Sequence, residues 1–218
     1  MGCKCVVFDM DGVLFDSESL VIQCWEKTAE KYNISDIKAI CQSCLGVNSV
    51  ATKKKFLEKY GDDFPYDAYK KEMSELYWNE VKAGKLQLKS GVMEILKFLK
   101  ENDFAVGIAS STRLKVIEEE TKRFGLFDMF DKIIGGDMVK NSKPSPEIYL
   151  TACKELNVLP EESYAVEDSY NGIRSASAAG MHAIMIPDLL PPNEEMEHLA
   201  EHIFTSMGEF QKHLQSFC

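Results

Sequence analysis

Residues 5–17 read CVVFDMDGVLFDS, and they hold the strongest structural signal in the chain. The apolar run of residues 6–8 is typical of a strand that is buried on both faces of a sheet. Asp9 and Asp11 follow it directly, and Gly12 comes next. Ligands bind outside the carboxyl ends of strands in open α/β sheets, and two like charges this close favour a counter-charge such as a divalent cation. The alternative is a solvated acidic turn, because plain turns and calcium loops share this pattern.

The composition is that of a folded protein without signals for nucleic-acid or membrane binding. The chain has 218 residues and a net charge of −10, and 45% of the residues are apolar. This length suits one large domain, or a core domain with a small insert. The acidic balance disfavours nucleic acid as a partner, and no apolar run approaches the roughly 20 residues of a membrane helix. The N-terminus lacks the pattern of a signal peptide, so we expect a cytoplasmic location, and nothing requires more than a monomer.

The region after the first strand predicts helices and no strand. Apolar residues at helical spacing cover most of residues 17–88, with breaks at Gly46 and at residues 61–63. That region holds equal numbers of acids and bases, so the rest of the chain carries the negative balance. We therefore expect a separate helical unit, inserted after the first strand.

From residue 89 the pattern changes to alternating helices and strands. Buried strands are predicted at residues 104–109, 132–134, 164–166 and 182–186, with helices between them. Such alternation predicts a parallel sheet with helices on both faces. The expected fold is a doubly wound, Rossmann-like α/β core of residues 1–16 and 89–218, into which the all-helical unit of residues 17–88 is inserted.

Polar residues follow the later strands of this predicted sheet. Ser110 and Ser111 open a helix with hydroxyl and N–H groups that suit a phosphate, although serine is also an ordinary helix cap. Lys143 lies in a turn stiffened by two prolines, although a lysine is usually just solvated. Glu167 and Asp168 form a second acidic pair before a helix, where acids also interact favourably with the helix dipole.

These groups are most informative together, because the carboxyl ends of parallel strands meet at one edge of the sheet. Four acids around one point require a metal, and oxygen ligands favour Mg²⁺. A lysine and hydroxyl donors beside the metal suit a phosphoryl group, whose negative charge they share. A carboxylate at a strand end can then attack phosphorus and form an acyl phosphate.

Taken in order, Asp9-Met-Asp-Gly-Val, Ser110, Lys143-Pro and Glu167-Asp168 resemble the four motifs of the haloacid dehalogenase-like phosphohydrolases. The resemblance covers essentially the whole chain, including a helical cap between the first two motifs. It is strongest for the branch that contains beta-phosphoglucomutase and phosphoglycolate phosphatase. It implies that Asp9 is the nucleophile and that Asp11 is the general acid and base, which distinguishes phosphotransferases from true dehalogenases.

The resemblance also implies a metal site. Mg²⁺ would be bound by Asp9, by the backbone carbonyl of Asp11 and by Asp168, with Glu167 in the first or second coordination shell.

The same resemblance assigns the phosphoryl group to the other two motifs. Ser110 and the amide of Ser111 would hold its oxygens, and Lys143 would neutralise both the nucleophile and the transferred group. The implied partner is a small phosphorylated metabolite.

The helical cap departs from the sugar-phosphate mutase of this branch. That mutase carries a histidine on its first cap helix and an arginine after a glycine-valine pair. At these positions this chain has Val21, or Leu20 if the alignment shifts by one residue, and Ser49. Both departures remove groups that would hold a second sugar phosphate. We therefore expect hydrolysis of a sugar phosphate or phosphoglycolate rather than intramolecular phosphate transfer. A mutase, and a binding protein that uses this fold without activity, stay open as alternatives.

Overall fold

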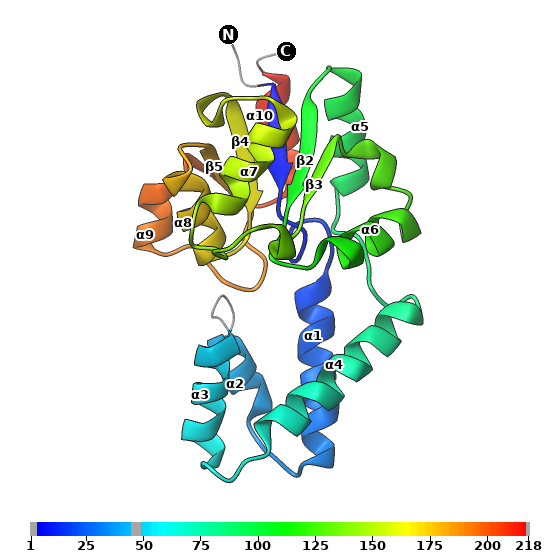
Figure 1. Ribbon diagram of the computed structural model, residues 1–218, viewed down its shortest axis with the longest axis vertical. Helices are drawn as coiled ribbons and strands as arrows, with labels where there is room; N and C mark the ends of the chain where they lie inside the picture. The colour runs from blue at the N-terminus through cyan, green and yellow to red at the C-terminus, as the bar shows by residue number, and fades with distance from the viewer. Residues whose placement is uncertain (1–3, 45–48, 217–218) are drawn as a thin grey trace. The chain divides into compact units, whose positions relative to one another are not determined.

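Figure 1 shows a computed structural model of the chain, which describes residues 4–44 and 49–216. The chain divides into two compact units, one of residues 1–14 with 88–218 and the other of residues 15–87. We call them the α/β unit and the helical unit, and each is described by itself. That they are separate domains, as the sequence suggests, stays a prediction. None of the helices in the described residues is long and apolar enough to cross a membrane.

The α/β unit is built on a parallel sheet. Its strands within the described residues are β1 (Cys5–Phe8), β2 (Ala105–Ala109), β3 (Lys132–Ile134), β4 (Ser163–Glu167), β5 (His182–Met185) and β6 (His202–Ile203). They lie in the order β3-β2-β1-β4-β5-β6, and each neighbouring pair is parallel. This order confirms the doubly wound α/β fold, and its direction reverses between β1 and β4.

The central strand β1 brings three strand ends to one level. All four of its residues are 0% exposed, as expected for an apolar run covered on both faces. Phe8 pairs with Ile108 of β2 and with Val166 of β4. The residues that follow these three positions therefore emerge side by side at the same edge of the sheet.

Helices cover both faces of this sheet (Figure 1). One face carries α7 (Glu147–Leu156), α8 (Tyr170–Ala178) and α9 (Glu194–Leu199), the other carries α5 (Val92–Glu101) and α10 (Met207–Gln215), and α6 (Leu114–Arg123) lies against β3. Val7 of β1 packs into a buried cluster with Tyr149 of α7 and Ile173 of α8. The sequence analysis predicted no element beyond residue 186. It missed β6, α9 and α10, because two- to nine-residue elements give little periodicity to detect.

The described part of the α/β unit also contains the short 3₁₀ helices η1 (Phe127–Met129), η2 (Gly136–Met138) and η3 (Pro160–Glu162). The chain leaves this unit after residue 14 and returns to it at residue 88. The Lys89 N–H donates to the Leu14 carbonyl (2.9 Å), so the points of exit and return are hydrogen-bonded neighbours.

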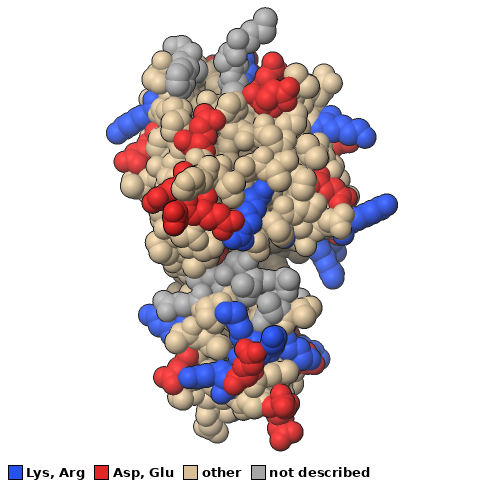
Figure 2. All heavy atoms as spheres, turned by 90° about the vertical axis from the view of Figure 1, so that its left-hand side faces the viewer, with Lys and Arg blue, Asp and Glu red and all other residues tan. Residues whose placement is uncertain are grey.

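The helical unit contains α1 (Ser17–Lys31), α2 (Ile37–Cys44), α3 (Ser49–Tyr60) and α4 (Tyr66–Lys82), close to the predicted helices. Its core is aromatic: Phe56 lies against Trp25 and Tyr69, with ring centroids 5.0 and 5.6 Å apart. The buried Tyr69 hydroxyl donates to the Trp25 carbonyl (2.7 Å). The face of this unit drawn in Figure 2 carries both positively and negatively charged side chains.

Some of the residues in which the helical insert departs from the mutase lie outside the described residues. The glycine-valine pair falls in residues 45–48, and the side chain of Ser49 is likewise not described, although its backbone begins α3. Val21 lies within α1 and is half-buried.

Candidate active site

The end of β1 places Asp9 beside the end of β4. The Asp9 N–H donates to the Val166 carbonyl (2.9 Å), which continues the ladder by one residue. Asp9 is 7% exposed, and Glu167 and Asp168 are 0% and 5% exposed. Carboxylate oxygens of these three acids all lie within 4.8 Å of one another. Because the strand order reverses between β1 and β4, this is the position where open α/β sheets bind ligands.

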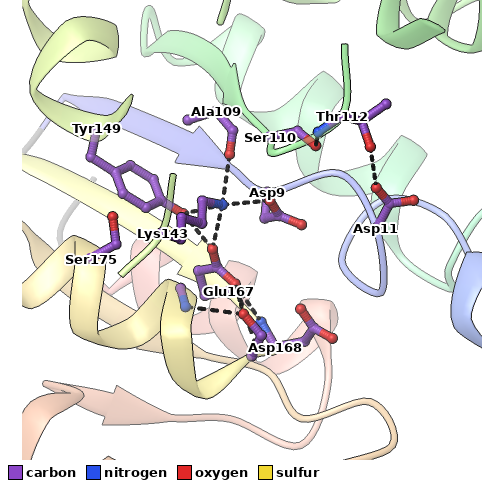
Figure 3. Close-up of polar contacts among 12 residues, drawn as sticks. Asp9, Asp11, Ala109, Ser110, Thr112, Lys143, Tyr149, Glu167, Asp168 and Ser175 are labelled. Atoms are coloured by element: carbon purple, nitrogen blue, oxygen red, sulfur yellow. Dashed lines mark hydrogen bonds and ion pairs between the residues drawn. The ribbon is translucent and has the colours of Figure 1, made fainter. Parts of the chain in front are cut away.

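Lys143 joins two of these acids (Figure 3). Its Nζ donates to Asp9 Oδ1 (2.5 Å), to Glu167 Oε1 (2.6 Å) and to the Ala109 carbonyl at the end of β2 (2.9 Å). The side chain is only 6% exposed. A buried ammonium is costly unless it is paired, and here each of its three protons has an acceptor. We call Asp9, Lys143, Glu167 and Asp168 the Lys143 cluster.

Burial is the largest influence on the pKa values of Asp9 and Lys143. It raises the pKa of Asp9 to about 8 against the opposing charge of Lys143, and Glu167 and Asp11 raise that pKa further. Burial alone would lower the pKa of Lys143, but Asp9 and Glu167 raise it above its ordinary value. With every group ionised, three carboxylates face one ammonium. A divalent cation would balance the two excess negative charges and favour the ionised form of Asp9.

The backbone at Gly12 passes directly against the Asp168 carboxylate. Gly12 has a φ of +77°, and a Cβ placed there would lie 2.3 Å from Asp168 Oδ2. Glycine adopts this conformation at no steric cost, and the Asp168 carboxylate fills the position that a Cβ would take. The grouped carboxylate oxygens of Asp9, Glu167 and Asp168 and their excess of negative charge together fit Mg²⁺.

Tyr149 is a part of this site that the sequence analysis missed. It is 0% exposed in α7, and its hydroxyl donates to Glu167 Oε1 (2.9 Å), the oxygen that also accepts from Lys143. Burial, followed by the charge of Glu167, raises the pKa of Tyr149 well above its ordinary value, so the phenol keeps its proton. The other carboxylate oxygen of Glu167 accepts from the Ser169 hydroxyl (3.1 Å). Both oxygens of Glu167 are therefore held by protein donors.

Ser110 follows β2 at the same edge of the sheet. Its N–H donates to the Ile134 carbonyl of β3 (3.0 Å), and its hydroxyl accepts from the Thr112 N–H (3.1 Å). Ser110 is 1% exposed, whereas Ser111 is exposed. This loop packs closely on η2, since a Cβ on Gly136 would lie 2.3 Å from the Ser111 carbonyl oxygen. The turn after β2 is thus fixed in place by its neighbours.

The Asp11 carboxylate lies beside the Lys143 cluster and is not hydrogen-bonded to it. Figure 3 shows its carboxylate directed toward Thr112, whose hydroxyl donates to Asp11 Oδ2 (2.8 Å). Asp11 therefore lies next to the cluster, while its side chain is held by the loop after β2. Thr112 was not among the predicted site residues, and nothing in the spacing of the sequence indicated its contact with Asp11.

Comparisons with known proteins agree with this geometry. The profile of the haloacid dehalogenase-like hydrolase family matches residues 6–186. A phosphorylated carbohydrates phosphatase of Thermotoga maritima is 34% identical over 181 residues, which cover 83% of each chain. CbbY from Rhodobacter sphaeroides, solved in complex with phosphate, superposes with a TM-score of 0.75 at 27% identity, over 95% of this chain and 96% of CbbY. A beta-phosphoglucomutase from Clostridium difficile superposes with a TM-score of 0.76 over 98% and 96% of the two chains, and at 24% identity this is a likeness of fold alone.

Proposed function

Because the chain belongs to the haloacid dehalogenase-like hydrolase family, we propose that it is a Mg²⁺-dependent phosphatase of small phosphorylated metabolites. The observation that carries this proposal is the contact of Lys143 Nζ with Asp9 Oδ1, inside a cluster of three acids at the switch point of the sheet. The resemblance of the four motifs to phosphohydrolases, and a relative named as a phosphorylated carbohydrates phosphatase, support it further.

Asp9 is the proposed nucleophile. A carboxylate oxygen of Asp9 attacks phosphorus, the bond from phosphorus to the ester oxygen breaks, and an aspartyl phosphate forms. Asp11 gives its proton to the departing oxygen. It then takes a proton from the water that attacks phosphorus, so that the bond to Asp9 breaks and inorganic phosphate leaves. Lys143 pairs with the nucleophile and balances the negative charge gathered on the transferred group.

The proposed metal site uses the carboxylates of Asp9 and Asp168 and the backbone carbonyl of Asp11. Glu167 is better suited to an outer role, because both of its oxygens already accept hydrogen bonds from protein groups. A bound Mg²⁺ would supply positive charge to the phosphoryl oxygens. Ser110 and the amide of Ser111 would hold those oxygens.

We favour net hydrolysis over phosphate transfer within a sugar phosphate. Val21 and Ser49 stand where the related mutase carries a histidine and an arginine, so this chain lacks two groups that would grip a second phosphate. The substrate class is a sugar phosphate or a small phosphorylated acid such as phosphoglycolate. The mutase is the second candidate, because the four motifs resemble most strongly the branch that contains beta-phosphoglucomutase.

The test is a phosphate-release assay with the purified protein, with and without Mg²⁺, on a panel of sugar phosphates and phosphoglycolate. We expect Mg²⁺-dependent release that is lost in Asp9→Asn and retained in Asp128→Asn, a matched change at an exposed residue of η1. Interconversion of hexose 1- and 6-phosphates without free phosphate would replace the phosphatase by the mutase. Binding of a phosphorylated ligand without turnover in the wild-type protein would leave only a binding protein.

A further inference from the structure

We propose that Thr112 is a positioning residue that orients the Asp11 carboxylate for proton transfer. The inference rests on the proposed function and adds to it a residue outside the four motifs. Its basis is the hydrogen bond from Thr112 Oγ1 to Asp11 Oδ2 (2.8 Å), which joins two segments 101 positions apart in the chain.

The hydroxyl of Thr112 has no role in capping the helix that follows. α6 begins at Leu114, its N-cap is Arg113, and that cap makes no side-chain hydrogen bond. The N–H of Leu114, at the start of α6, instead donates to the Asp137 carboxylate (2.9 Å). Serine and threonine before a helix are most often caps, so the usual structural explanation does not apply to Thr112.

The backbone of Thr112 is anchored on both sides. Its N–H donates to the Ser110 hydroxyl (3.1 Å), and its carbonyl accepts from the Gly136 N–H (2.8 Å). A β-branched side chain also has few rotamers. The position of the Thr112 hydroxyl is therefore set by the loop that carries Ser110. The same loop thus holds Ser110, the proposed phosphate-binding residue, and Asp11, the proposed proton donor, in fixed positions relative to each other.

The direction of the hydrogen bond decides which oxygen of Asp11 handles the proton. An ionised carboxylate only accepts, and the single hydroxyl proton of Thr112 is given to Oδ2. Oδ1 is then the oxygen that gives a proton to the leaving alkoxide and later takes one from water. Without the Thr112 hydroxyl, the Asp11 carboxylate would rotate more freely and spend less time in the productive orientation.

The experiment compares Thr112→Val, which replaces the hydroxyl by a methyl group, with Thr112→Ser, which keeps the hydroxyl. Thr151→Val is the matched control, because Thr151 is also half-buried and its hydroxyl donates only to the Glu147 carbonyl within α7 (2.7 Å). Each protein is assayed with Mg²⁺ on glycerol phosphate, an alkyl ester, and on 4-nitrophenyl phosphate, an aryl ester. The aryl alcohol departs without a proton, so its release reports formation of the aspartyl phosphate without acid catalysis.

We expect Thr112→Val to lower kcat for the alkyl ester about tenfold to a hundredfold, the range for one hydrogen bond to a charged group. The KM should stay within about twofold, since the hydroxyl does not hold the substrate. With the aryl ester, the initial burst of nitrophenolate should keep its rate while the following steady state slows, because hydrolysis still needs Asp11 as a base. Thr112→Ser should recover most of the lost kcat, and Thr151→Val should behave as wild type.

An unchanged or raised kcat in Thr112→Val, or a burst slowed as much as the steady state, would overturn the inference while leaving the phosphatase intact. Absence of turnover in the wild-type protein would overturn both. Thr112→Ala is the second variant for the same comparison if Thr112→Val lowers the midpoint of thermal unfolding.

Discussion

The phenol of Tyr149 should stabilise the Lys143 cluster, and Tyr149→Phe measures by how much. The ring stays, so no cavity forms, and Glu167 Oε1 loses one of its two donors while it keeps Lys143 (2.6 Å). A hydrogen bond to a charged group contributes about 1.5–3 kcal/mol. The retained partner reduces the loss, so we expect the free energy of unfolding to fall by about 1–2 kcal/mol. For a chain of this size that is a fall of about 2–8 °C in Tm.

The assay for Tyr149→Phe is thermal and urea unfolding followed by far-ultraviolet circular dichroism. Circular dichroism is preferred to tryptophan fluorescence because Trp25 and Trp78 both lie in the helical unit, whereas Tyr149 lies in the α/β unit. Tyr170→Phe is the control: its hydroxyl donates to the Pro191 carbonyl at an exposed position (2.6 Å), and its loss should cost no more than about 0.5 kcal/mol. Equal stability losses in the two variants would refute the reasoning that the buried charge makes the Tyr149 bond strong.

Three further changes test the site and the fold. Gly12→Ala should abolish Mg²⁺-dependent phosphate release, because the added Cβ would meet the Asp168 carboxylate. It should also lower the free energy of unfolding more than Gly61→Ala, where the added Cβ meets nothing. Equal effects of the two changes in activity and unfolding assays would contradict this. Lys143→Met should lower the free energy of unfolding by about 3–5 kcal/mol, since it leaves buried carboxylates unpaired, and calorimetry should find part of the loss restored by Mg²⁺. Burial lowers the pKa of His213 from 6.5, so its folded form favours the neutral ring. The stability that depends on the neutral ring is present above pH about 6.5 and is lost as the pH falls. His213→Gln should therefore make the fall in Tm between pH 7 and 5 less steep. A fall in Tm as steep as that of the wild-type protein would contradict this prediction.

Much of the fold was predictable because its signals are local. An apolar run ending in acids predicted β1, and regular alternation predicted the parallel sheet and its helices. β6 escaped prediction because two residues, His202 and Ile203, show no period.

The candidate site was predictable only in its outline. Asp9, Lys143 and Glu167 could be grouped because parallel strands bring their carboxyl ends to one edge. Tyr149 reads as one more apolar position of an amphipathic helix, and its hydrogen bond to Glu167 depends on how α7 packs on the sheet. The turning of Asp11 toward Thr112 likewise depends on the tertiary position of a loop, which no spacing in the sequence encodes.

The hydrogen bond between Leu14 and Lys89 has a consequence for how such proteins diversify. The chain leaves the α/β unit and returns to it at adjacent points, so the intervening segment is a cassette whose length and sequence can change without parting the strands. The groups proposed for the chemistry are all encoded outside that cassette, in residues 4–14 and 88–216. Recombination at these two junctions would exchange one insert for another and leave the proposed chemical groups unchanged.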